Sequence, residues 1–286
     1  MENSPFEIAV AGQTLHGHLY PCPKPRAVVL IVHGMGEYGR RYERAVIPEL
    51  LKNNLSVLVY DQFGHGSNTG KRGHHPGYEY LLESIDKCLE IAKSTFQDLP
   101  VFLYGHSMGG NVVLNYAISR PSKIKGAVVT SPFLRLAFEP PAWKLALGKL
   151  LGQLLPSVTL ANEIDASSIS QIEEEVEAYR NDPLIHDRVS PAYSIVVMEK
   201  GEHVIKRASE ISLPVLLLHG SSDRLTDPGA SRELARKAEG QVEYVEVEGG
   251  YHELHHDLKR QEVIMHIIEW IGRFARGGQT GRQNKD

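Results

Sequence analysis

A serine between two glycines lies where a buried strand is expected to turn into a helix. Residues 101–104 (Val-Phe-Leu-Tyr) indicate the strand, residues 105–109 fit the pattern G-x-S-x-G around Ser107, and a helix is expected from Asn111 to Ser119. In this context the pattern predicts a strained turn that lifts the serine hydroxyl above the edge of a sheet. Glycines at both flanks are required because side chains there would clash with the neighbouring strand or helix. We therefore predict that Ser107 is a nucleophile in ester or amide cleavage.

A serine hydroxyl attacks only when a base takes its proton and a carboxylate orients that base. Both partners are expected later in the chain, each just past the end of a strand. The loop after the apolar run Leu213–Leu218 offers two carboxylates, Asp223 and Asp227. Asp227 directly precedes Pro228 and an expected helix, which is the position of a helix N-cap. This assignment leaves Asp223 as the predicted acid.

The predicted base is His252, in a glycine-rich turn between the strand expected at 242–247 and the last helix. His255 and His256 are the alternatives. We expect both of them to lie toward or on the final helix, exposed to solvent.

The same histidine begins the pattern H-E-x-x-H at residues 252–256, which zinc metalloproteases use. That chemistry needs both histidines on adjacent turns of one helix and a third ligand downstream. His252 follows Gly249 and Gly250 closely, where a helix is disfavoured, and Glu269 would lie far along the final helix. We therefore expect neither a metal nor a cofactor.

Negative charge that develops on the substrate needs hydrogen-bond donors, and two backbone N–H groups are candidates. Met108 opens the helix after the serine, and Met35 lies in the glycine-rich turn 33–36 after the buried strand expected at 26–32. Each donor of such an oxyanion hole contributes roughly 3 kcal/mol to stabilising the transition state. The alternative for residues 33–36 is a turn without a catalytic task.

Residues 61–67 form a second glycine-rich turn, after the strand expected at 55–60. Its glycines suggest a phosphate-binding loop, but the required G-K-[ST] ending is missing. We expect this turn to brace the neighbouring residues 33–36.

The elements that must position these side chains alternate between strands and helices. After a hairpin at 6–10 and 14–20, strands are expected at 26–32, 55–60, 101–104, 124–130, 213–218 and 242–247, and helices at 42–53, 77–96, 111–119, 229–239 and 258–275. Continuous β-branched runs indicate strands buried on both faces, whereas the last strand alternates and is expected at a sheet edge. The order predicts an α/β fold with a mainly parallel central sheet flanked by helices.

About 80 residues between the strands at 124–130 and 213–218 lack a buried-strand signal and indicate helices at 141–155, 169–179 and 193–207. We predict an inserted helical cap at 133–210, which divides the core into 1–132 and 211–276 and is followed by a polar, flexible tail at 277–286. The cap is expected over the carboxyl edge of the sheet, where such folds bind ligands. Its helix 141–155 combines Trp143 with several leucines, Leu147 among them, and with Lys144 and Lys149. This stretch predicts an acyl channel or transient contact with a membrane surface; the alternative is that the leucines only dock the cap.

Composition narrows the classes of function. The 286 residues carry a net charge of −4, which gives no indication of a nucleic-acid partner. Two cysteines, Cys22 and Cys88, are too few for a disulfide framework and are expected to be free thiols. No apolar run is long enough to span a membrane and no secretory signal is visible. We expect a cytoplasmic protein, with peripheral association at membranes through the cap.

Six motifs in one order resemble the monoacylglycerol lipase and lysophospholipase branch of the α/β-hydrolases, over about residues 14–274. They are His33-Gly-Met-Gly-Glu-Tyr, Asp61-Gln-Phe-Gly-His-Gly-Ser, Gly105-His-Ser-Met-Gly-Gly, Asp182-Pro-Leu, His219-Gly-Ser-Ser-Asp-Arg-Leu and Gly250-Tyr-His. The resemblance implies a triad of Ser107, Asp223 and His252 with Met35 and Met108 as oxyanion donors. We expect substrate contacts from Gly34, His106, Phe133, Trp143 and Leu147.

The resemblance also implies a lipid ester substrate, with hydrolysis of monoacylglycerols to fatty acid and glycerol through an acyl-enzyme at Ser107. A lysophospholipase or a general carboxylesterase is the alternative enzyme, and a ligand-binding receptor on the same fold is the alternative without catalysis. One departure is the bulky Met35, where relatives often have a small residue. It leaves the backbone donor intact and is expected to narrow the acyl entrance.

Overall fold

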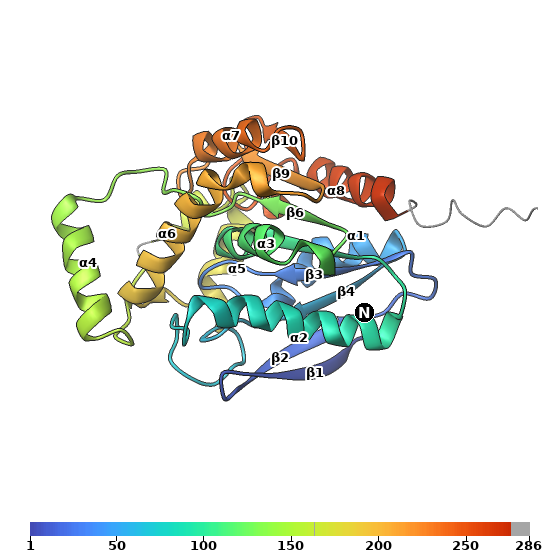
Figure 1. Cartoon of the computed structure of the whole chain (residues 1–286), viewed down its shortest axis with the longest axis horizontal. Helices are drawn as coiled ribbons and strands as arrows, with labels where there is room; N and C mark the ends of the chain where they lie inside the picture. Colours follow the sequence, from blue (N-terminus) through green and yellow to red (C-terminus); the bar gives the residue numbers. More distant parts are fainter. Residues whose placement is uncertain (163, 276–286) are drawn as a thin grey trace, which may run out of the picture.

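An eight-stranded sheet forms the centre of the molecule in the computed structural model, which describes residues 1–162 and 164–275 (Figure 1). Its strands are β1 (Ser4–Val10), β2 (Gln13–Tyr20), β3 (Ala27–Val32), β4 (Leu55–Tyr60), β5 (Val101–His106), β6 (Gly126–Thr130), β9 (Val215–Gly220) and β10 (Val242–Val247). They lie in the order β1-β2-β4-β3-β5-β6-β9-β10. β2 pairs antiparallel with both of its neighbours, β1 and β4, and the pairs from β4 to β10 are all parallel. The predicted α/β fold, hairpin and edge position of the last strand are confirmed.

Helices cover both faces of the sheet because the central strands are apolar on both sides. On one face α2 (Tyr78–Phe96) and α3 (Met108–Ser119) share a buried cluster with Val28, Leu30 and Leu103, and α7 (Pro228–Lys237) packs against β9 and β10. On the other face α1 (Val46–Lys52) and α8 (Arg260–Ala275) pack against Val29, Ile31 and Phe102. The tail predicted at 277–286 lies outside the described residues.

The helix expected at 42–53 is shorter than predicted. A 3-10 helix, η1 (Gly39–Arg44), comes first, and α1 begins only at Val46. Pro48 explains the break, because a proline has no N–H to donate to the carbonyl four residues earlier and its ring crowds that carbonyl. The proline is therefore accommodated in the first turn of a new helix.

Residues 133–210 contain the helices α4 (Ala142–Leu154), α5 (Glu173–Asn181) and α6 (Pro191–Lys206), and a short pair of strands, β7 (Leu160–Ala161) and β8 (Arg188–Val189). Figure 1 shows α4 at one end of the molecule, with α6 between it and the sheet. Helix α6 has two faces: Tyr193, Val197 and Val204 are buried in the core shared with α3, whereas α4 packs against the other side. It is therefore the crossover from β6 to β9 as well as the support of α4. The division of the chain into core and cap stays a prediction.

None of the described helices combines the length and the hydropathy needed to cross a membrane. Helix α2 is the longest at 19 residues, but its exposed face is polar and its buried face packs on the sheet. The short 3-10 helices Pro121–Lys123, Ala166–Ser168, Ala208–Glu210 and Leu254–His256 (η5) connect the larger elements.

The packing of α6 against the core can be tested by substitution of Gly201. A Cβ at this position would overlap the backbone of Leu134, whereas a Cβ on Gly148 in α4 would meet its nearest atom only at 3.9 Å. We expect Gly201→Ala to lower the free energy of unfolding by about 1–3 kcal/mol. The control Gly148→Ala should leave it unchanged or raise it by up to about 1 kcal/mol. Urea unfolding followed by circular dichroism measures both, and equal effects would contradict the packing described.

Candidate active site

Ser107 occupies a strained turn between the end of β5 and the start of α3. Its φ is 53° and its ψ is −117°, a backbone conformation that side-chain-bearing residues rarely adopt. A Cβ on Gly105 would lie 2.6 Å from the carbonyl oxygen of Gly109, and a Cβ on Gly109 would overlap the carbonyl of Val32. The predicted geometry of the elbow and the steric need for both glycines are therefore confirmed.

Asp223 and His252 come from the loops after β9 and β10, and their side chains meet in a buried contact. Nδ1 of His252 lies 2.7 Å from Oδ2 of Asp223. Oδ2 also accepts a bond from the Thr226 hydroxyl at 2.9 Å and lies 3.1 Å from Nε2 of His219. Oδ1 accepts the N–H groups of Leu225 and Thr226. The carboxylate is fixed on all sides, so it can hold the imidazole in one orientation.

The other carboxylate of this loop, Asp227, has the structural role expected from the sequence. Its Oδ1 accepts the N–H of Gly229 at 2.8 Å, and it caps α7. A cap of this kind satisfies one of the donors at the start of a helix that have no partner within it. The distinction between Asp223 and Asp227 drawn from the sequence agrees with these contacts.

The charges in this pair stabilise each other. Burial raises the pKa of Asp223, but the charge of His252 and hydrogen bonds from His219 and His252 outweigh it and hold the pKa well below its usual range. Burial lowers the pKa of His252, yet the charge of Asp223 and its hydrogen bond reverse the direction, so the pKa of His252 is raised. His252 is therefore a stronger base than a free imidazole.

The turn at 33–36 lies directly beside the elbow. A Cβ on Gly34 would lie 3.3 Å from Cβ of Ser107 and 3.0 Å from Oε1 of Glu37, whose carboxylate accepts the Gly34 N–H at 2.6 Å. Gly36 has a φ of 80°, and its carbonyl accepts the N–H of His186 from residues 133–210 at 3.0 Å. Met35 is thus held in a loop that is fixed on both sides and faces the first turn of α3.

Gln62 braces this loop, as the sequence predicted for residues 61–67. Its backbone N–H donates to Nε2 of His33 at 2.9 Å, and its side-chain amide donates to the His33 carbonyl at 2.6 Å. Asp61 fixes the turn itself by accepting the N–H groups of Gly39 and Ser67. The turn is therefore structural, and its glycines allow the tight backbone path.

Residues predicted to contact substrate occupy two different places. Gly34, His106 and Phe133 lie beside the elbow: the Phe133 N–H donates to the Ser107 carbonyl at 2.9 Å, and the His106 ring lies 4.9 Å from that of His252. Burial lowers the pKa of His106 to about 4, so this ring is neutral. Trp143 and Leu147 lie on the outer surface of α4, with Trp143 69% exposed. Whether these residues touch substrate stays a prediction.

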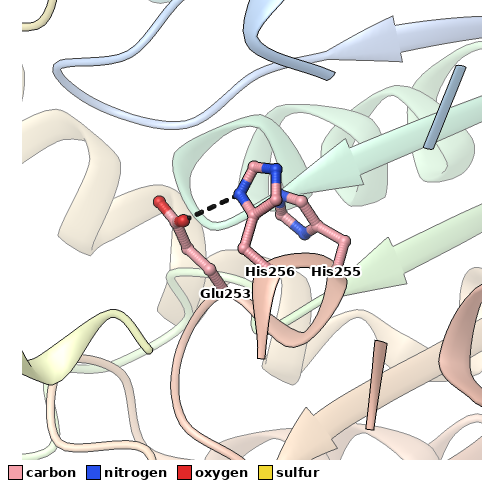
Figure 2. Close-up of side chains that lie close together, drawn as sticks. All are labelled: Glu253, His255 and His256. Carbon is pink, nitrogen blue, oxygen red and sulfur yellow. Dashed lines mark hydrogen bonds and ion pairs between the residues drawn. The ribbon is translucent and has the colours of Figure 1, made fainter. Parts of the chain in front are cut away.

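The expectation that His255 and His256 are exposed on or near the final helix is wrong. Both are fully buried, in η5, before α8 begins. The His255 ring stacks on Tyr42 at 4.9 Å, and Nδ1 of His256 lies 3.1 Å from Oε2 of Glu253 (Figure 2). The chain between the last strand and the last helix turns inward instead of leading directly into α8, which carries both side chains into the interior.

This inward turn also removes the zinc-protease arrangement. His252 lies outside η5 and uses Nδ1 toward Asp223, so it does not share a helix face with His256. Glu253, His255 and His256 do lie close together, and among the described residues they form the one cluster of side chains that could hold a metal ion (Figure 2). Both oxygens of Glu253 already accept bonds from Arg41, at 2.5 and 2.7 Å. A metal ion there would face the guanidinium charge at close range, which opposes binding.

Metal removal tests this interpretation. We expect a chelator to leave both the melting temperature and the ester hydrolysis of the purified protein unchanged, because Arg41 already supplies the positive charge that Glu253 requires. Differential scanning calorimetry with and without chelator or zinc measures the first quantity. A large stabilisation by zinc that is lost in His256→Ala would contradict the expectation.

Several residues of the site were not predicted from the sequence: His219, Thr226, Glu37, Arg41 and Glu253. His219 and Thr226 flank Asp223 within eight residues, so their proximity could have been inferred from the short loop. Arg41 and Glu253 are 212 residues apart, and no local pattern relates them.

Comparisons with known proteins show the family of this chain. The family model Hydrolase_4, described as serine aminopeptidase, S33, matches residues 23–259. The chain is 30% identical to a monoglyceride lipase of Rattus norvegicus, over 94% of this chain and 90% of the relative. It is 35% identical, over 88% of its length, to an uncharacterized abhydrolase domain-containing protein of Dictyostelium discoideum, but spans only 27% of that protein.

Solved structures lead to the same group. A crystal structure of a Paleococcus ferrophilus monoacylglycerol lipase superimposes with a TM-score of 0.83 at 34% identity, and the match covers 96% of this chain and all of that one. The matched length includes the α/β core and the helical segment between β6 and β9. The chain therefore belongs to the α/β-hydrolases of the Hydrolase_4 family, in the branch that contains the monoglyceride lipases.

Proposed function

We propose that this protein is a serine hydrolase that cleaves monoacylglycerols to fatty acid and glycerol. The observation that carries the proposal is the buried contact between His252 and Asp223, with the His252 ring 4.9 Å from that of His106, the residue directly before the strained Ser107. The choice of substrate is supported by two relatives that this chain matches over nearly their whole length. One is named a monoglyceride lipase and the other a monoacylglycerol lipase.

In the proposed mechanism His252 takes the proton from the Ser107 hydroxyl as the oxygen attacks the ester carbonyl. The tetrahedral intermediate places its negative charge between the N–H groups of Met35 and Met108. Met108 is the first residue of α3, so its N–H has no acceptor within the helix, and the helix N-terminus favours negative charge. Asp223 stabilises the imidazolium ion that forms.

The intermediate collapses when His252 gives its proton to the departing glycerol oxygen, and the acyl group stays on Ser107. Water then attacks the acyl-enzyme with His252 again as base, and the fatty acid leaves. His106 is neutral beside this centre and adds no competing positive charge. Its ring packs between the rings of His252 and His255.

A lysophospholipase is the second enzyme that the sequence allows, and a phosphate head group would need a cation beside the elbow. Arg41 donates a hydrogen bond to Glu37, whose carboxylate in turn accepts the Gly34 N–H in the turn at 33–36. It is already paired with Glu37 and Glu253. These contacts leave Arg41 without a free face for a phosphate head group.

The outer face of α4 supports transient contact with a lipid surface. Trp143, Leu147, Leu150 and Leu154 recur at intervals of four, three and four residues and therefore lie along one side of the helix. All four are exposed, while on the opposite side a Cβ on Gly152 would lie 3.3 Å from Ala192 of α6. An apolar stripe next to lysines is the pattern of a helix that lies in a membrane interface. The same surface could receive substrate directly from the bilayer.

Substitution of the nucleophile tests the chemistry. We expect Ser107→Ala to reduce kcat on a monoacylglycerol by at least about 10³-fold. It should also abolish labelling by a fluorophosphonate probe, with the melting temperature retained. The control Ser84→Ala, in α2 with a hydroxyl bonded only to Tyr80, should keep both activities. Unchanged hydrolysis in Ser107→Ala would refute the mechanism, and a substrate panel including lysophospholipids and short esters would identify the preferred ester.

Substitution of the stripe tests the lipid contact. We expect Trp143→Ser combined with Leu150→Ser to lower activity on monoacylglycerol in phosphatidylcholine vesicles about tenfold, since two apolar side chains no longer enter the interface. Activity on a short, soluble ester should not change. Leu258→Ser removes an equally exposed leucine far from the stripe and is the matched control. An equal loss on both substrates would show that α4 acts on the site itself and not on the membrane.

A further inference from the structure

A buried group of charged side chains lies behind His252, outside the proposed triad. Arg41 comes from η1, and Glu253 is the residue directly after His252; their side chains are 3% and 4% exposed. Nη1 of Arg41 donates to Oε1 of Glu253 at 2.5 Å, and Nη2 donates to Oε2 at 2.7 Å. Two parallel bonds of this kind fix the relative orientation of the two segments as well as their distance.

Glu37 extends this group to the turn that carries the proposed oxyanion donor. Nη1 of Arg41 also donates to Oε2 of Glu37 at 3.1 Å. Oε1 of Glu37 accepts the N–H of Gly34 at 2.6 Å and the hydroxyl of Tyr42 at 3.0 Å. A continuous path of hydrogen bonds therefore runs from the residue next to His252 to the residue next to Met35.

Stability alone does not account for such a group. Charges buried together lose their hydration, and well-packed apolar side chains of similar volume are often at least as stabilising. Burial raises the pKa of Glu253, but the charge of Arg41 outweighs this effect and holds the pKa well below its usual range. Glu37 is likewise ionised, because the charge of Arg41 overcomes the effect of burial and lowers its pKa. Both carboxylates therefore carry negative charge in the interior, with Arg41 shared between them and His256 in contact with Glu253.

His252 is within the influence of that charge. Burial lowers the pKa of His252, and Asp223 raises it most strongly, but Glu253 and Glu37 raise it further. The other groups packed around this histidine are His106 from β5, which is neutral, and His219 and Thr226, which hold Asp223. His255 lies on the far side of His106, where burial lowers its pKa well below the ordinary value and keeps it neutral.

We propose that Glu253, through its bidentate bond to Arg41, is a positioning residue that ties the loop of His252 to the turn at 33–36 and keeps a negative charge near His252. The proposal rests on the proposed function, because it takes His252 as the general base. Two effects follow. The base and the oxyanion donors keep a fixed separation, and the imidazolium ion formed in the transition state is stabilised by more than Asp223.

The experiment compares Glu253→Gln, which keeps the size of the side chain and loses its charge, with Glu253→Asp, which keeps the charge. Asp86→Asn is the matched control. Asp86, in α2, is likewise a carboxylate paired with an arginine, Arg120 at the carboxyl end of α3, and it also pairs with Lys123. Initial rates on a short, soluble p-nitrophenyl ester are measured from pH 5 to 10 for each protein, together with the melting temperature.

The direction of the pH effect follows from the sign of the charge. Removal of a negative charge lowers the pKa of His252, so the base stays neutral to lower pH and the acid limb of kcat/KM moves downward. We expect Glu253→Gln to move this limb by about half a pH unit or more and to lower kcat about tenfold, with little change in KM. Glu253→Asp should restore the position of the limb, and Asp86→Asn should leave both parameters at wild-type values.

A Glu253→Gln enzyme that only melts at a lower temperature, with kcat and the acid limb unchanged, would overturn the proposal. If that variant does not fold, Arg41→Lys retains the positive charge without the fork and should lower kcat in the same way; wild-type kcat there would also overturn it. Labelling of the wild-type protein by a fluorophosphonate separates this failure from the failure of the proposed function. Absence of label at Ser107 refutes the function, whereas normal label with unchanged Glu253→Gln kinetics refutes only the role of Glu253.

Discussion

The close crossing of two backbones at Gly109 determines the arrangement of the site. The first turn of α3 passes so near the end of β3 that any side chain at this position would overlap the Val32 carbonyl. Because β3 and β5 are neighbours in the sheet, this contact brings the turn after β3 beside the elbow after β5. The two proposed oxyanion donors, Met35 and Met108, belong to these two segments. Loss of the crossing would therefore separate them even if the sheet stayed intact.

The parallel sheet supplies the remaining order. Asp223 and His252 follow β9 and β10, which are hydrogen-bonded neighbours, so the two loops leave the same edge of the sheet side by side. The short distance between the two side chains then requires only that each loop turns toward the elbow, and Thr226 and His219 fix the carboxylate in that position. The chemistry depends on strand adjacency more than on any single loop conformation.

The fold and the candidate triad could be inferred from the sequence because the residue patterns that mark them are local. β-branched runs mark β3 and β4, a glycine pair marks the elbow, and Pro228 marks Asp227 as a cap. The inward turn at His255 had no such signal, because the sequence H-E-x-x-H is as compatible with the beginning of the final helix as with a separate buried turn. The pairing of Arg41 with Glu253 depends on contact between segments 212 residues apart, and only the folded chain brings them together.

Buried charge is unevenly distributed around the site. The side near Asp223 is satisfied by hydroxyl, imidazole and backbone donors, so its negative charge is shared among several partners. On the side near Glu253, one guanidinium is shared by two carboxylates, Glu37 and Glu253. A single arginine of η1 thus connects Glu37, which holds the turn at 33–36, with Glu253 in the loop of His252.

Helix α4 has no buried residue, and its close neighbour is α6, which it meets through Gly148 and Gly152. The free energy that holds it in place is therefore small compared with that of the core, because little apolar surface is removed from water. Opening of α4 can occur as a local event while α6 stays anchored by Tyr193 and Val197. The protein thus combines a rigid core around His252 with a segment, α4, whose exchange with solvent is set by a different and much lower stability.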